Sequence, residues 1–239
     1  MGDRVSERFP EGRPILCSLP SINKMTKGFR EGELAVIASR PYVAKAAFAL
    51  KLAREMTFES GERVSTLYYS PEKAVFLTEG FEAECRKYVE GTDIKAIFID
   101  CTMLDFSEAG EMPRIAKMLR HFAQELGIAV FCLCTLGEKR GKDSVPKLED
   151  LGDCGFPVED ADLVFLLDEP EVRYSMEHEV GVKLVRVIFA KLRNGVTGTY
   201  PFRFWEEDLE FEDVAENHKK SLKKASEISN IFCSFGDYR

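Results

Sequence analysis

Short apolar segments alternate with helix-forming segments along the first two thirds of this chain, and that alternation constrains its fold more than any other feature. Strands that alternate with helices predict a parallel sheet covered by helices on both faces. Apolar runs of strand length lie at residues 33–39, 64–69, 95–100, 129–134 and 163–167. Helical patterns lie at residues 21–28, 43–55, 71–88 and 111–126.

The last third of the chain has a different pattern. Two apolar segments, 182–190 and 200–205, flank Arg193-Asn194-Gly195 and predict a late hairpin. Tightly joined strands of this kind should add antiparallel to one edge of the sheet. Residues 138–160 are polar and contain Gly and Pro, which predicts a long loop with little regular structure.

These patterns divide the chain into three parts. Residues 1–19 are polar, contain Pro and Gly, and are expected to form an arm or linker rather than core. Residues 20–212 are expected to form one α/β domain with a mostly parallel central sheet. Residues 213–239 are expected to form a charged tail with a helix.

Charge and cysteine usage limit the location and the partners of the chain. The net charge of -8 implies no broad basic surface, so DNA binding would need a local patch or a ring of several copies. No segment has a signal-peptide pattern or the length of a membrane span, so no membrane partner is expected. The seven cysteines form no CxxC pair and are expected to be free buried thiols, with Cys132 and Cys134 on the same side of a strand. Such thiols suit a cytoplasmic protein.

Candidate functional residues lie where the predicted strands end, which is where open parallel sheets bind ligands. The loop at residues 39–46 keeps only Lys45 of the phosphate-binding signature GxxxxGK followed by Ser or Thr. By itself, such a lysine is usually a solvated surface residue. Glu72 could activate a water, or could simply favour the positive end of a helix dipole. Asp100 closes a strand and could support Mg²⁺. In this order the three residues favour a P-loop NTPase scaffold.

Several longer stretches carry a resemblance to a known family. Residues 40–50 read RPYVAKAAFAL, similar to ARPSMGKTAFAL, and residues 69–72 read YSPE, similar to FSLE. Ile99-Asp100 is similar to a Walker B motif, and residues 150–151 and 160–162 are similar to parts of DLRESGAIEQDAD. Residues 190–199, AKLRNGVTGT, are similar to AKQRNGPTGT. From about residue 20 to 212 the chain therefore resembles the C-terminal, RecA-fold domain of DnaB-family replicative helicases.

The resemblance implies a RecA-like P-loop NTPase fold with ATP and Mg²⁺ as cofactors. Lys45 would meet the β- and γ-phosphates, Glu72 would be the catalytic base, and Asp100 would hold Mg²⁺ through water. Lys191 and Arg193 would reach the nucleotide of a neighbouring subunit in a ring. The implied partners are further copies of the chain, a replication protein, or DNA.

The remaining positions of the implied nucleotide site are Arg40, Ala44, Ala46 and Thr135, and three of these depart from the family pattern. Ala44 replaces a glycine, and a positive φ at this residue would cost roughly 1–3 kcal/mol. Ala46 has no hydroxyl for Mg²⁺. Thr135 replaces a glutamine that senses the γ-phosphate. In addition, Gly152 replaces the arginine of DLRESG, and the stretch between residues 72 and 100 is shorter than in the family.

Three hypotheses follow from these similarities and departures. The chain could be a DnaB-like module with a degenerate nucleotide site that does not hydrolyse ATP and acts through ring-type protein contacts. It could instead be a divergent ATP-dependent DNA helicase, or another RecA-fold ATPase. The conformation of residues 39–46 separates them, because a closed turn would disable the site and an open nest of N–H groups would keep it competent.

Overall fold

The computed structural model describes residues 13–70, 80–102, 111–137, 145–170 and 181–214. Its strands are β1 (Ile15–Leu16), β2 (Leu34–Ser39), β3 (Thr57–Phe58), β4 (Ser65–Tyr69), β5 (Ile94–Asp100), β6 (Ala129–Thr135), β7 (Leu163–Asp168), β8 (Val182–Leu192), β9 (Gly198–Trp205) and β10 (Glu210–Asp213). Its helices are α1 (Pro20–Thr26), α2 (Lys45–Arg54), α4 (Gly80–Val89) and α5 (Glu111–Leu126), with short 3-10 helices η1 (Leu148–Cys154) and η2 (Val158–Asp160).

Eight strands form one sheet in the order β10-β9-β8-β7-β2-β6-β5-β4. The strands from β7 to β4 run parallel, whereas β8, β9 and β10 add antiparallel at one edge. This confirms the predicted α/β class and the antiparallel edge formed by the late hairpin.

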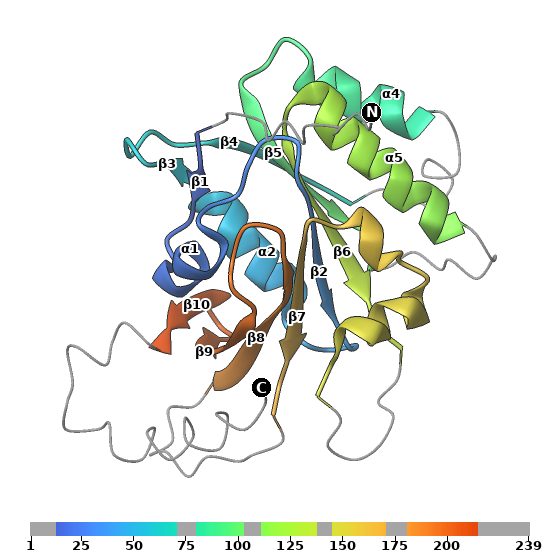
Figure 1. The fold of residues 1–239 in the computed structure, drawn as a ribbon. Helices are drawn as coiled ribbons and strands as arrows, with labels where there is room; N and C mark the ends of the chain where they lie inside the picture. Colours follow the sequence, from blue (N-terminus) through green and yellow to red (C-terminus); the bar gives the residue numbers. More distant parts are fainter. Residues whose placement is uncertain (1–12, 71–79, 103–110, 138–144, 171–180, 215–239) are drawn as a thin grey trace, which may run out of the picture.

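Helices cover both faces of this sheet (Figure 1). On one face α1 and α2 pack with Ile37, Phe131 and other apolar residues of the strands. On the other face α4 and α5 pack with a second set that includes Val36 and Val130. Because successive strand residues point to opposite faces, the apolar runs of the sequence supply both cores at once.

The described part of the predicted arm belongs to the core. Ile15, Cys17 and Leu19 are 0 %, 6 % and 3 % exposed, so the prediction that this segment is arm rather than core is wrong for residues 15–19. The reason is long-range backbone pairing. Ile15 and Phe29 exchange two hydrogen bonds of 2.8 Å, and β1 pairs with β3 in a separate two-stranded sheet.

The other differences lie in the late segments. The loop predicted to have little regular structure contains η1 and η2. A further strand, β10, pairs with β9 at the edge of the sheet, and the Asp213 carboxylate accepts a hydrogen bond of 2.6 Å from the backbone N–H of Ser21. The folded unit therefore includes Asp213, one residue past the expected boundary.

The cysteine prediction is confirmed for the described residues. Six cysteines there are free, five of them buried, and the sulfurs of Cys132 and Cys134 lie 3.7 Å apart on the same side of β6. None of the helices in the described ranges combines the length and the apolar character needed to cross a bilayer.

The turn after β8 packs closely against α1, and this predicts a strict requirement for Gly195. A Cβ atom at Gly195 would lie 2.0 Å from the backbone oxygen of Met25. We expect Gly195→Ala to lower the free energy of unfolding by about 1–3 kcal/mol, because the turn must shift away from α1. Urea unfolding measures this change. Gly152→Ala is the control, since a Cβ there meets nothing within 4 Å; equal losses in both variants would contradict the prediction.

Candidate functional site

The loop between β2 and α2 forms a closed turn at its end. The backbone N–H of Lys45 donates to the oxygen of Val43 at 2.6 Å, and Ala44 between them has φ -67° and ψ 43°. These angles are those of an inverse γ-turn, which any L-residue can adopt. The positive φ considered for Ala44 is therefore wrong. Tyr42 has it instead, with φ 67°, and its side chain is fully exposed.

This turn changes what the start of α2 offers to a phosphate group. Backbone N–H groups at a helix N-terminus attract anions because the helix leaves them without carbonyl partners. The N–H of Lys45 is already bonded to Val43, so the first-turn amides without an intrahelical partner are those of Ala46 and Ala47. The turn therefore uses up one backbone N–H group at the start of α2, that of Lys45, and not those of the next two residues.

Lys45 is the first residue of α2, and only 7 % of it is exposed. Its contact with nucleotide phosphates stays a prediction. Burial lowers the pKa of its ammonium, while the nearby Asp100 carboxylate acts in the opposite direction. Among the described residues its ammonium makes no hydrogen bond or ion pair.

Asp100 ends β5 on the same edge of the sheet, and its carboxylate is engaged by the protein. The Tyr68 hydroxyl donates to Oδ2 at 2.7 Å, and the backbone N–H of Thr102 donates to Oδ1 at 3.0 Å. Burial, and then the contact with Asp100, raise the pKa of the Tyr68 hydroxyl. The hydroxyl therefore stays protonated and remains a donor to this carboxylate at neutral pH.

Tyr68 is a site residue that motif comparison does not reveal. Strand alternation places it on the α2 side of the sheet, whereas Tyr69 packs on the opposite core. Its register partner is Phe98, two residues before Asp100. The period-2 pattern of β4 and the parallel pairing with β5 are the signal that could have found it.

The strands bring the remaining predicted positions to the same edge. Ser39 is paired with Thr135 at the ends of β2 and β6, and the Thr135 hydroxyl donates to the oxygen of Thr102 at 3.4 Å. The Arg40 guanidinium donates to the Gly137 oxygen at 3.0 Å and lies 3.4 Å from the Asp150 carboxylate. Arg40 therefore ties the loop to η1.

The residues described at this edge do not fit Mg²⁺. Ala46 offers a methyl group where the cation needs an oxygen, and both oxygens of Asp100 already accept hydrogen bonds from the protein. Across the described ranges, no cluster of three or more His, Cys, Asp or Glu side chains is arranged for a metal ion. Glu72, predicted as the catalytic base, lies outside the described residues.

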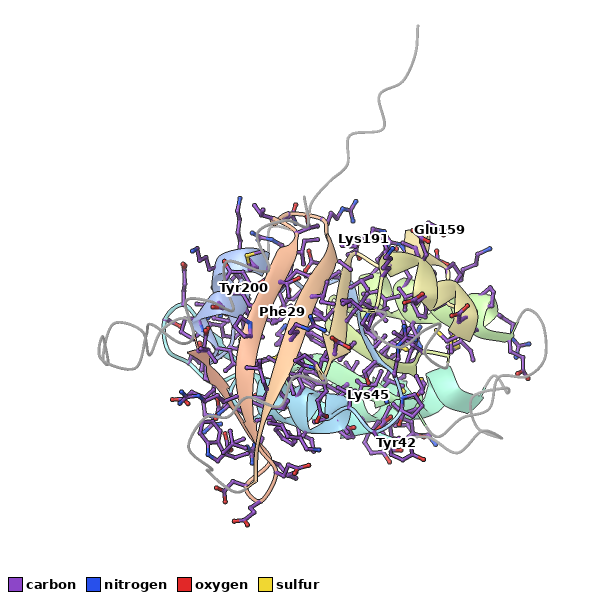
Figure 2. The ribbon with its side chains drawn as sticks, turned by 90° about the horizontal axis from the view of Figure 1, so that it is seen from below. Phe29, Tyr42, Lys45, Glu159, Lys191 and Tyr200 are labelled. Carbon is purple, nitrogen blue, oxygen red and sulfur yellow. The ribbon has the colours of Figure 1, made fainter. Side chains whose placement is uncertain are left out.

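Lys191 lies at the opposite end of the sheet from Lys45 (Figure 2), and Arg193 follows directly after β8 at the same end. The Lys191 ammonium donates to the oxygens of Val158 and Ala161 at 2.7 and 2.6 Å. Burial lowers the pKa of this ammonium. The Arg193 side chain, 37 % exposed, pairs with the Asp162 carboxylate at 2.8 Å. Both cations are anchored within their own chain, and their reach to a neighbouring subunit stays a prediction.

Asp162 anchors this end of the molecule. Its carboxylate, 4 % exposed, also pairs with Arg120 of α5 at 3.1 Å and accepts the backbone N–H of Leu34 at 3.0 Å. One buried carboxylate thus joins α5, the start of β2 and the turn after β8. Two arginines and a backbone amide compensate its desolvation.

Glu33 is a second buried carboxyl group beside this turn. It is 8 % exposed, and it accepts hydrogen bonds from the Arg30 N–H at 2.9 Å and the Asn194 amide at 3.4 Å. Burial raises the pKa of its carboxyl from 4.5 to about 7. The folded state therefore favours the protonated, neutral form of the Glu33 carboxyl group.

The raised pKa of Glu33 predicts a pH-dependent loss of stability. The stabilisation is complete below the unfolded-state pKa of 4.5 and is lost as the pH rises through about 7. Between about pH 5 and about pH 8, the wild type should lose roughly 1–3 kcal/mol of unfolding free energy relative to Glu33→Gln. Urea unfolding at both pH values measures the difference. Glu59→Gln, at an exposed position, should parallel the wild type; parallel curves for Glu33→Gln would contradict the prediction.

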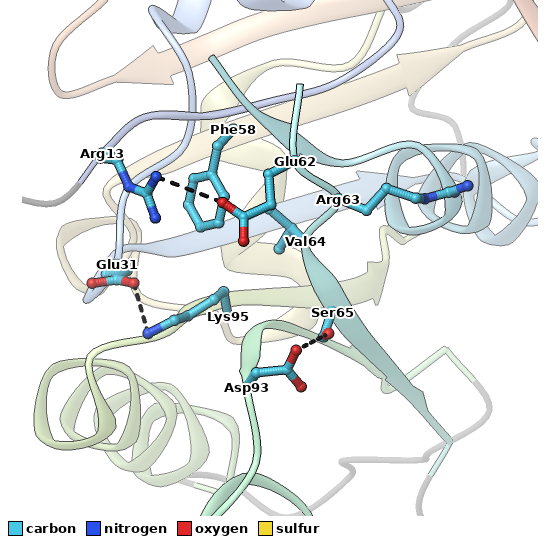
Figure 3. Close-up of a pocket in the computed structure, with 9 residues that line it drawn as sticks. All are labelled: Arg13, Glu31, Phe58, Glu62, Arg63, Val64, Ser65, Asp93 and Lys95. Carbon is cyan, nitrogen blue, oxygen red and sulfur yellow. Dashed lines mark hydrogen bonds and ion pairs between the residues drawn. The ribbon is translucent and has the colours of Figure 1, made fainter. Parts of the chain in front are cut away.

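A cavity of about 350 Å³ lies away from these groups, at the amino ends of β4 and β5 (Figure 3). Its charged side chains are largely paired with one another. Glu62 lies 3.7 Å from Arg13, and Lys95 lies 3.1 Å from Glu31. Since these charges already compensate each other, the cavity shows no preference for an anion and is not the phosphate site.

Comparisons with known proteins find a matching family model and related sequences. A family model described as the DnaB-like helicase C-terminal domain matches residues 15–76 and 73–213. The replicative DNA helicase DnaC of Bacillus subtilis is 24 % identical over 249 residues, covering 80 % of this chain and 54 % of that protein. The replicative DNA helicase DnaB of Geobacillus stearothermophilus is 24 % identical over 267 residues, covering 87 % and 58 %. The chain thus spans a little over half the length of these relatives.

Two solved structures share the fold. One, an isolated ATPase domain, superposes with a TM-score of 0.65 at 20 % identity, covering 86 % of this chain and 93 % of that one. The other, a DnaB-like replicative helicase solved with a view to its interactions with primase, gives a TM-score of 0.62 at 22 % identity, covering 82 % and 62 %. At these identities the likeness is one of fold.

Proposed function

The chain belongs to the family of DnaB-like helicase C-terminal domains, and on that premise we propose that it binds nucleotide phosphates weakly, without useful ATP hydrolysis. In this proposal it acts in DNA replication through ring-type contacts with copies of itself or with another replication protein. A primase is one partner of this kind, by analogy with the relative solved for that interaction.

The observation that carries the proposal is the closed turn before α2. The bond from Lys45 N–H to the Val43 oxygen removes one phosphate-facing donor, and Ala46 removes the hydroxyl that would hold Mg²⁺. Losing a single transition-state donor typically costs about 10²–10³ in rate. Several such losses at one site support a domain that does not turn over ATP.

A specific observation also favours a second candidate, a divergent ATP-dependent DNA helicase. Lys45 remains buried beside Asp100, and its ammonium has no partner among the described residues. A lysine that served only the core would gain from an ion pair in this position. This arrangement supports nucleotide binding more directly than hydrolysis. The match to the helicase family disfavours another kind of RecA-fold ATPase.

Restoring the two missing groups distinguishes the candidates. We expect Ala44→Gly/Ala46→Thr to bind ATP–Mg²⁺ about tenfold or more tightly than the wild type, because the turn can open and a metal ligand returns. Calorimetry measures the affinity, and phosphate release measures the rate. Lys45→Ala is the control for both. Wild-type hydrolysis that Lys45→Ala abolishes would overturn the proposal and establish the helicase alternative.

The ring-type contact has its own test at Arg193. If this side chain contacts a neighbouring copy, Arg193→Ala should shift the protein toward smaller species in sedimentation velocity, with the midpoint of assembly moving at least about tenfold in concentration. Arg203→Ala, on β9, is the matched control. Thermal melting confirms that both variants are folded. Identical assembly of the wild type and Arg193→Ala would contradict the interface.

A further inference from the structure

We propose that Tyr68 makes the loop before α2 a metal-independent phosphate site, because its hydroxyl donates to the Asp100 carboxylate that would otherwise support a hydrated metal ion. The site would then take a linear polyphosphate chain, free or as part of a nucleotide, without Mg²⁺. This inference rests on the proposed function and names the form of ligand that the same site accepts.

The first step of the argument is the state of Asp100. A carboxylate that supports a hydrated cation must accept hydrogen bonds from the water molecules of that cation. Here Tyr68 donates to Oδ2 at 2.7 Å and Thr102 N–H donates to Oδ1 at 3.0 Å. Tyr68 lies on the neighbouring strand β4 and Thr102 lies just after β5, so each oxygen of Asp100 already has a protein donor without a metal.

The second step concerns the charge that remains for a ligand. Asp100 favours the charged form of Lys45, which burial disfavours. Its negative charge therefore stabilises the ammonium of Lys45. Lys45 is only 7 % exposed, its ammonium has no partner among the described residues, and the positive end of α2, a helix of 10 residues, lies beside it. The ammonium and the helix end attract an anion directly.

The third step is the matching loss at Ala46. A hydroxyl at the second residue of α2 would be a metal ligand. Without it, a Mg²⁺ ion would have no side-chain ligand at this position and would have to share Asp100 with the Tyr68 hydroxyl. Two independent positions, on β4 and on α2, thus disfavour the same cation while Lys45 is retained.

The test compares the affinity for ATP in EDTA with the affinity in excess Mg²⁺, using calorimetry on the full chain. For the wild type we expect the two affinities to agree within about threefold. For Tyr68→Phe we expect Mg²⁺ to tighten ATP binding about tenfold, because Oδ2 of Asp100 loses its protein donor and accepts a metal-bound water in its place. Lys45→Ala should lose binding in both conditions, which places the ligand at this loop.

Tyr200→Phe is the matched control, since it removes the same hydroxyl from β9 and should behave like the wild type. Inorganic tripolyphosphate is titrated beside ATP; similar affinities assign the site to the phosphate chain, and tighter ATP binding assigns it to the whole nucleotide. Thermal melting verifies the fold of each variant.

Three results would overturn the inference: wild-type binding that requires Mg²⁺, a Tyr68→Phe variant with the metal dependence of the wild type, or no binding of either ligand to the wild type. The proposed function fails by a different result, ATP hydrolysis that depends on Lys45. The metal dependence can therefore be refuted while the absence of hydrolysis stands.

Discussion

The burial of β2 on both faces is the constraint on which the rest of the structure depends. All six residues of this strand are buried, and it pairs in parallel with β6 on one side and β7 on the other. Its carboxyl end sets the position of the loop before α2, and its amino end is bonded to Asp162. Because this strand is enclosed on both sides, it fixes the position of both of its ends, and with them the two candidate functional regions of the domain.

The two ends of the sheet have different chemistry. At the carboxyl end, Asp100 lies close enough to Lys45 to favour its charged form. The same carboxylate accepts a hydrogen bond from the Tyr68 hydroxyl. At the amino end, the buried carboxylate of Asp162 pairs with the partly exposed Arg193 and Arg120. The first end keeps a cation that no described residue pairs with and has Ala46 where the family pattern has a hydroxyl, and the proposal of binding without turnover rests on this combination. The second end holds its cations in a fixed geometry, as a surface for protein contacts would require.

Much of the fold could be predicted from residue patterns. The sequence predicts β2, β4, β5, β6 and β7 to within a residue or two of their observed bounds. This is possible because apolar runs and the spacing of apolar residues are properties of the local sequence. The burial of Ile15 and the addition of β10 could not be predicted in this way. The burial of Ile15 depends on pairing with Phe29, in a separate segment. β10 pairs with the preceding strand β9, but it is mostly acidic (Glu210, Glu212 and Asp213) and so has no apolar run to mark it as a strand. The same holds for the candidate site. Motif positions in the sequence identify Lys45 and Asp100, whereas the role of Tyr68 depends on the pairing of β4 with β5.

The sequence by itself determined the family of the fold, the edge of the sheet where a phosphate would bind, and the absence of a glycine and a hydroxyl from the loop. These properties follow from which residue occupies which position of a strand or motif. Only the tertiary structure decided that Ala44 avoids a positive φ and that Tyr42 has one instead. It also brings the Tyr68 hydroxyl, from a neighbouring strand, into hydrogen-bonding distance of the Asp100 carboxylate. The physical reason is that backbone angles and cross-strand hydrogen bonds depend on how separate segments are packed together, which no local pattern specifies.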